Sequence, residues 1–162
     1  IWLDNGELEG DDTDAHIDTL ARFAPGNTIV FQGCHDQSDS HYRPLQAMKA
    51  ELTTATNANG DVFNLLELPL PQPIHADDGH RLPATYANYL ITNKLVLVPL
   101  YGDVADAEAL RIIADAYPEH IISGINARPL IEEHGSLHCI TMQLPKGSVN
   151  FTAPFEQLHV AG

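Results

Sequence analysis

Apolar residues recur along this chain at helical spacing in two places. Residues from His41 to about Thr56 carry apolar side chains at three- and four-residue steps, which indicates an amphipathic helix. These positions are Leu45, Met48, Leu52 and Ala55. A second helix is predicted after Gly102, with Asp103 as its N-cap and Pro118 as its stop. Its apolar stripe consists of Ala107, Leu110, Ile113, Ala114 and Tyr117.

Short apolar runs rich in β-branched and aromatic residues predict the strands. The expected strands are about residues 17–23, 28–31, 62–68, 85–91, 95–100, 121–125 and 138–144. Between the third and fourth of them, residues 69–83 form a long loop, because their prolines exclude a continuous helix.

The order of these elements repeats, and this predicts an α/β fold. A strand, a strand, a helix and a strand occur in residues 11–68 and again in residues 84–126, and a third unit begins at residues 137–145. Side chains differ between the units, so the repeat is one of architecture. Equivalent positions in such an array face a common axis. His16 and Asp18 open one unit and Cys139 opens another, so we expect them to share a pocket.

Composition narrows the range of ligands. The chain has 162 residues, 22 of them acidic and 8 basic, with a net charge of −14. This balance argues against nucleic acids and anionic membranes as partners, since both bind through Lys and Arg, and it favours a cationic ligand.

No apolar run is long enough for a transmembrane helix. The chain begins with Ile1 and has neither an initiator Met nor a signal peptide, so we expect a natural polypeptide that extends upstream or is processed.

The two cysteines, Cys34 and Cys139, are too few for a disulfide scaffold, and we expect a reducing, cytoplasmic compartment. A bridge between them would remove the thiol of Cys139 from any reaction, and the sequence leaves that pairing open. Without a bridge, Cys139 is either a nucleophile or a small core residue.

Two segments near opposite ends of the chain combine groups suited to attack on a cationic carbon. Cys139 offers a strong nucleophile, and His16 can give and take a proton. Carboxylates fix a planar guanidinium through paired hydrogen bonds, and the candidates are Asp12, Asp14 and Asp18. The alternative for His16 and Asp18 is a polar loop rim.

Metal binding is not expected. A calcium loop starting at Asp12 would need Gly at position 17 and Glu at position 23, where the chain has Ile17 and Phe23. A site made of His16, Asp18 and His138 lacks tight ligand spacing. We therefore expect no metal and no cofactor. Part of the long loop is crowded with polar side chains and is either solvated or a lid over the pocket; these residues are His75, Asp77, Asp78, His80 and Arg81. Residues 34–36 form a plain loop.

Three blocks of sequence carry a family resemblance. They read EGDDTDAHID at residues 9–18, LPATYANY at residues 82–89 and GSLHCITMQ at residues 135–143. In this order they resemble the motifs of the agmatine deiminase and bacterial-type peptidyl-arginine deiminase family. The family belongs to the guanidino-modifying superfamily, so the resemblance implies a pentein fold, a five-bladed α/β propeller of ββαβ units around a central pocket.

The resemblance also implies roles for individual residues. Cys139 is the nucleophile that forms a covalent amidino-thioether, and His16 acts first as the general acid and then as the base for water. Asp18 holds the guanidinium, with Asp12 and Asp14 as further substrate contacts. Ammonia leaves first, and a ureido product follows. With agmatine the product is N-carbamoylputrescine, an intermediate of putrescine biosynthesis and polyamine metabolism.

Two departures from the family pattern limit the resemblance. Ala15 stands where the family usually has Gly, and the family's N-terminal half is absent, so residues 1–162 correspond to the C-terminal half of a deiminase domain. The isolated chain is therefore either inactive or dependent on that half, or on a homo-oligomer, to close the pocket. Peptidyl arginine as the substrate, and a non-catalytic acidic domain that binds cations or a partner, remain the alternatives to agmatine hydrolysis.

Overall fold

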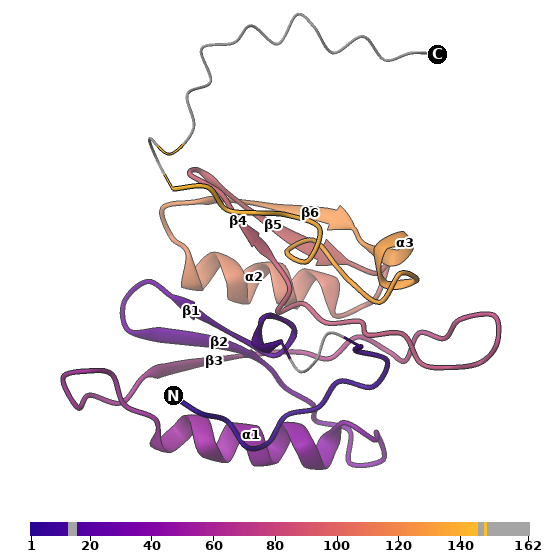
Figure 1. Ribbon diagram of the computed structural model, residues 1–162, viewed down its shortest axis with the longest axis horizontal. Coiled ribbons are helices and arrows are strands. Elements are labelled where there is room, and N and C mark those ends of the chain that lie inside the picture. Colours follow the sequence, from indigo (N-terminus) through magenta and orange to yellow (C-terminus); the bar gives the residue numbers. More distant parts are fainter. Residues whose placement is uncertain (13–15, 146–147, 149–162) are drawn as a thin grey trace, which may run out of the picture.

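The computed structural model describes residues 1–12, 16–145 and 148, and it contains two units of the same topology (Figure 1). The first unit consists of η1 (Ile17–Thr19), β1 (Ala21–Ala24), β2 (Thr28–Gln32), α1 (Tyr42–Thr54) and β3 (Asn64–Leu68). The second consists of β4 (Leu90–Ile91), β5 (Leu95–Leu100), α2 (Asp106–Ala116) and β6 (Ile121–Asn126), followed by α3 (Arg128–Ile131).

Each unit builds a three-stranded mixed sheet. The strand orders are β1-β2-β3 and β4-β5-β6, with the first pair antiparallel and the second pair parallel in both sheets. A parallel pair needs a long crossover connection, and α1 and α2 supply it. The predicted ββαβ order is therefore confirmed in both units.

The layers follow from the residues that β2 and the helices bury. Ile29 and Phe31 of β2 pack in one cluster with residues of α1, whereas Val30 faces the opposite way into the larger cluster around α2. Every residue of β2 is buried, as expected for a strand with a helix on each face. Figure 1 shows α1 on the outer side of the first sheet and α2 between the two sheets.

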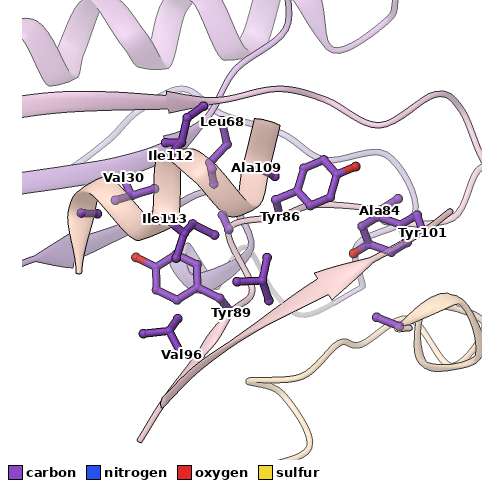
Figure 2. Close-up of a cluster of buried hydrophobic side chains, with 14 of the residues drawn as sticks. Val30, Leu68, Ala84, Tyr86, Tyr89, Val96, Tyr101, Ala109, Ile112 and Ile113 are labelled. Carbon is purple, nitrogen blue, oxygen red and sulfur yellow. The ribbon is translucent and has the colours of Figure 1, made fainter. Parts of the chain in front are cut away.

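The larger hydrophobic core surrounds α2 (Figure 2). Tyr86 and Tyr89, both fully buried, lie in this cluster beside Ile113 of the helix. Because α2 contacts β2 and β3 of the first sheet and β6 of the second, this core joins the two units. Among the described residues, no helix has the length and apolar character to cross a bilayer.

The second helix differs in detail from its prediction. It begins at Asp106 with Ala105 in the N-cap position, so Asp103 is not the N-cap. The Asp106 carboxylate accepts hydrogen bonds from the backbone N–H groups of Tyr101, Gly102 and Asp103, which shapes the chain before the helix. The predicted stripe is also partly wrong, because the side chains that α2 buries are Ala109, Ile112, Ile113 and Ala116.

Three predicted strands need correction. Residues 17–23 divide into the 3₁₀ turn η1 and strand β1, and the strand predicted at residues 85–91 is limited to β4. The strand predicted at residues 138–144 is wrong: residues 137–140 form a turn, and residues 141–145 have no regular structure. In that segment Ile140, Met142 and Leu144 alternate as in a strand, but their side chains are exposed.

Candidate functional site

Cys139 and Asp18, 121 positions apart in the sequence, lie side by side. The Sγ atom of Cys139 is 3.6 Å from Oδ2 of Asp18. Cys139 lies in the turn at residues 137–140 and is exposed, whereas Asp18 lies in η1 and is half-buried. The structure thus brings the predicted nucleophile to one of the predicted carboxylates, although Cys139 does not open a strand.

Asn88 lies between these two side chains. Its Nδ2 atom donates hydrogen bonds to Oδ2 of Asp18 at 2.7 Å and to Sγ of Cys139 at 3.3 Å. Its Oδ1 atom accepts the backbone N–H of His138 at 2.9 Å. The Asn88 side chain is fully buried, so the carboxamide has a fixed place among these groups. Sequence reasoning did not single out this residue, although it belongs to the block at residues 82–89.

The segment that carries Asn88 is buried without being a strand. A buried backbone outside a sheet needs other hydrogen-bond partners. Gln32, at the end of β2, accepts the N–H of Tyr86 at 3.1 Å through Oε1, and the Tyr101 hydroxyl donates to the carbonyl of Thr85 at 2.8 Å. The Thr85 hydroxyl in turn donates to the carbonyl of Thr19 at 2.7 Å, directly after Asp18. These bonds fix the position of Asn88 relative to η1.

The segment before η1 carries the other predicted site residues. His16 is exposed and occupies the N-cap position of η1, two residues before Asp18. Its carbonyl accepts the Thr19 hydroxyl, which also bonds Oδ2 of Asp11 at 2.9 Å. Asp12 is exposed, and Asp14 lies outside the described residues, as does Ala15. The roles of His16, Asp12 and Asp14 stay predictions.

His138 adds an imidazole ring in the residue before Cys139. Burial lowers the pKa of His138, and the positive charge of Arg22 lowers it further, while the Asp18 carboxylate acts in the opposite direction. Arg22 is held by the second unit, because its Nη1 atom donates to the carbonyl of Tyr89 at 2.9 Å and its guanidinium lies 5.1 Å from the centre of the Tyr89 ring. These effects favour the neutral imidazole over the imidazolium that would pair with a thiolate.

The second cysteine is separate from this site. Cys34 is buried in the cluster beside α1, and both cysteines are free thiols, which resolves the pairing that the sequence left open. Burial raises the pKa of the Cys34 thiol, and a hydrogen bond with the backbone of Asp36 offsets part of that effect. Cys34 is consequently a poor nucleophile, and Cys139 is the thiol suited to chemistry.

A pocket of about 480 Å³ lies elsewhere, between the loop at residues 34–40 and the long loop at residues 69–83, called the proline-rich loop from here on. Its walls include Cys34, Asp39 and Arg81, but neither Cys139 nor Asp18. In the part of the chain that the structure describes, His, Cys, Asp and Glu side chains nowhere gather in threes as metal ligands would.

Comparison with known proteins adds a family context. Residues 1–145 match the family model of Porphyromonas-type peptidyl-arginine deiminase. The chain is 33% identical to the agmatine deiminase of Stutzerimonas stutzeri (strain A1501), over 90% of this chain and 44% of that protein. It thus spans less than half the length of the curated relatives that it matches.

Solved structures that resemble this chain include agmatine deiminases as well. An agmatine deiminase from C. jejuni with substrate bound aligns with a TM-score of 0.77 and 47% identity, covering 85% of this chain and 39% of its own. The agmatine deiminase of Enterococcus faecalis aligns with a TM-score of 0.77 and 29% identity, covering 87% of this chain and 44% of its own. The predicted fold class, ββαβ units making up about half of a pentein, is confirmed by these alignments.

Proposed function

The chain belongs to the Porphyromonas-type peptidyl-arginine deiminase family, and we propose that it carries the nucleophilic part of an enzyme that hydrolyses a guanidino group and releases ammonia. The observation that supports this most is the approach of Cys139 Sγ to Asp18 Oδ2, at 3.6 Å. A thiol at the surface beside a half-buried carboxylate is arranged to meet a cation: the carboxylate binds its N–H groups, and the sulfur faces its carbon.

The reaction follows from these groups. The Cys139 thiolate attacks the guanidinium carbon, and the electron pair of the C=N bond moves to nitrogen. His16 protonates a terminal nitrogen, and the C–N bond breaks. Ammonia departs, and an amidino-thioether remains on the sulfur. His16 then takes a proton from water, whose oxygen attacks the same carbon. The C–S bond breaks as the new hydroxyl group loses its proton to solvent, the thiolate returns, and the product carries a urea group in place of the guanidine.

Agmatine is the substrate that we propose. The relative from Stutzerimonas stutzeri and the C. jejuni structure both carry the name agmatine deiminase, and the latter has its substrate bound. A net charge of −14 favours a small dication. Hydrolysis would convert agmatine to N-carbamoylputrescine. Peptidyl arginine is the second candidate, because the matching family model bears that name.

The remaining pocket wall would come from outside this chain. Cys139 is exposed, and the chain covers 44% of the length of the Stutzerimonas stutzeri enzyme. A guanidinium that is attacked by a thiolate needs a site closed to bulk water. We therefore assign the groups that cover the substrate, and those that recognise its far end, to the rest of the polypeptide or to a second subunit.

The test uses the natural polypeptide that contains this chain and measures ammonia release from agmatine. Cys139→Ser is expected to abolish release, while Cys34→Ala, which removes the buried thiol, retains it. Turnover that survives in Cys139→Ser would refute the nucleophile. Release from an arginine-containing peptide in place of agmatine selects the second substrate. A non-catalytic domain would leave Cys139 unlabelled by a haloacetamidine.

A further inference from the structure

Asparagine is followed by glycine at two places in this chain, at Asn5 with Gly6 and at Asn59 with Gly60. In such a pair the backbone nitrogen of the glycine can attack the carboxamide of the asparagine, because glycine has no side chain to hinder the approach. The reaction needs a carboxamide that is free to turn and a main chain that is free to bend. The structure distinguishes the two pairs in both respects.

Asn5 is held against α1. Its Nδ2 atom donates to Oε1 of Glu51, and its backbone N–H donates to Oε2 of the same carboxylate at 3.4 Å. Gly6 packs closely on the helix as well, since a Cβ atom there would lie 2.8 Å from Sδ of Met48. A hydrogen bond to a charged acceptor is stronger than a neutral one, so the Asn5 carboxamide is fixed in place.

Asn59 lies at the tip of the turn at residues 57–61, which joins α1 to β3 and projects beyond the end of the first sheet (Figure 1). Asn59 and Gly60 are both exposed, and the Asn59 carboxamide makes no hydrogen bond with any described residue. A Cβ atom added at Gly60 would have nothing within 4 Å, so the main chain has open space around it. The second pair thus meets both requirements of the reaction.

The base of the same turn is braced. Oδ1 of Asn57 accepts the backbone N–H groups of Asn59 at 2.8 Å and of Asp61 at 3.0 Å. Nδ2 of Asn57 donates to Oδ1 of Asn27 at 3.0 Å, so this carboxamide is occupied at both atoms. One contact opposes attack at the tip, because the Gly60 N–H donates to the carbonyl of Asn57 at 3.0 Å. A neutral hydrogen bond at an exposed loop tip opens at low cost.

We propose that Asn59 is a site of spontaneous deamidation, a covalent modification that does not depend on the proposed function. The backbone nitrogen of Gly60 attacks Cγ of Asn59 and forms a succinimide ring. The bond from Cγ to Nδ2 breaks, and the proton displaced from the backbone nitrogen leaves with the amide as ammonia. Water then opens the ring. Cleavage of the new N–Cγ bond gives an aspartyl residue, whereas cleavage of the original peptide bond routes the main chain through Cγ and gives an isoaspartyl residue.

The modification changes both the charge and the shape of the turn. Either product adds a negative charge to a chain whose net charge is already −14. The isoaspartyl product also lengthens the main chain between two hydrogen bonds of the turn, that of the Asn59 N–H and that of the Gly60 N–H. The bond from Asn57 to Asn27 holds the base of the turn separately, so the distortion should stay within residues 57–61.

The test incubates the natural polypeptide, folded, at mildly alkaline pH and follows the loss of each amide by peptide mapping with mass spectrometry. Asn59 should convert about tenfold faster than Asn5, because the Asn5 carboxamide must first leave a charged acceptor. In the urea-unfolded chain the two residues should convert at similar rates, since the structure no longer separates them. Methylation of the peptide that contains residue 59 by an isoaspartyl methyltransferase identifies the isoaspartyl product.

Two variants test the physical argument. Glu51→Ala removes the acceptor that holds Asn5, so conversion of Asn5 in the folded protein should rise about tenfold while that of Asn59 stays the same. Gly60→Ala places a methyl group beside the attacking nitrogen and should remove most of the conversion of Asn59, folded or unfolded. Equal rates at Asn5 and Asn59 in the folded wild type would overturn the proposal, as would conversion of Asn59 only after unfolding or unchanged conversion in Gly60→Ala.

Discussion

The guanidinium of Arg81 makes two parallel hydrogen bonds to the carboxylate of Asp39, from Nη1 to Oδ1 at 2.8 Å and from Nη2 to Oδ2 at 2.9 Å. The pair ties the proline-rich loop to the loop before α1. Both side chains are buried, with 9% and 8% of their surface exposed. His41 completes the cluster, because its Nδ1 atom contacts Asp39 Oδ1 at 2.9 Å and its Nε2 atom accepts the N–H of Glu9 at 2.7 Å.

Arg81→Met should therefore be strongly destabilising. Removing one partner of a buried ion pair leaves the other charge unpaired, which costs about 3–5 kcal/mol. Urea unfolding of the variant measures the loss. The matched control is Arg111→Ala, because Arg111 also makes a 2.9 Å bond to an aspartate, Asp115, with both side chains more than half exposed. It should change the free energy of unfolding by less than about 0.5 kcal/mol, and equal losses in the two variants would contradict the argument.

The same cluster predicts a loss of stability in acid. Burial alone would raise the pKa of Asp39, but hydrogen bonds from Arg81 and from the N–H of His41 outweigh it and lower the pKa to about 2. A depressed pKa in the folded state stabilises the fold above the ordinary value of 3.8, and this contribution disappears as the pH falls from about 4 to about 2. The amount is about 2 kcal/mol.

The comparison of wild type with Asp39→Asn isolates that contribution. Asp39→Asn should be the less stable protein at pH 6, and the difference in free energy of unfolding should shrink as the pH falls toward 2. Urea unfolding at a series of pH values provides the measurement. A difference that stays constant between pH 5 and pH 2.5 would show that the Asp39 carboxylate is not the group that titrates.

Gly10 should not tolerate a side chain. Its φ is +85°, and a Cβ atom there would lie 2.2 Å from the carbonyl oxygen of Arg81. Gly60 has nearly the same φ, +87°, but a Cβ atom added there would have nothing within 4 Å. Gly60→Ala should cost about 1–2 kcal/mol from backbone strain alone, and Gly10→Ala a further 1–3 kcal/mol, roughly, from overpacking. Thermal unfolding of the two variants measures both losses of stability. Equal losses would show that the proline-rich loop moves to make room for a Cβ atom at position 10.

Gln32→Leu should impair both stability and catalysis. The buried amide accepts from the N–H of Tyr86 at 3.1 Å and donates to the carbonyl of Pro69 at 2.6 Å, so a leucine leaves buried polar groups unpaired at about 1–3 kcal/mol each. Because this amide supports the segment that carries Asn88, ammonia release should also fall. Gln72→Leu, at an exposed position, is the control and should change neither quantity. A Gln32→Leu variant that is less stable but keeps full turnover would contradict the link between this amide and the site.

The regular parts of this fold are predictable because each element satisfies its pattern locally. The spacing of Leu45, Met48 and Leu52 suffices for α1, since all three side chains face the first sheet. The run from Leu95 to Leu100 is a strand in the structure with the predicted bounds. Its pattern is strong because α2 covers one face of the sheet. The helix itself is less well predicted, since it packs between two sheets and buries a different stripe from the one that spacing suggests.

The irregular parts depend on contacts that no local pattern contains. Alternation at Ile140, Met142 and Leu144 predicts a strand, yet burial decides strand formation, and these side chains are exposed. The candidate site is half predictable for the same reason. Cys139 and Asp18 stand out as chemical groups, whereas Asn88 is a neutral residue in an apolar run, and only its position between the two shows that it belongs to the site. The one sequence feature that could have drawn attention to Asn88 is its amide side chain within an apolar run, between Ala87 and Tyr89.

The turn that carries Cys139 follows both sheets in chain order, and Asn88 anchors it to them. A ribosome releases the amino-terminal part of a chain first, at about 5–20 residues per second. Asp18 and Asn88 are therefore synthesised before the cysteine codon is translated. The turn that carries the sulfur is thus the last part of the site to be made, and its anchoring to Asn88 is the step that completes the pairing of Cys139 with Asp18.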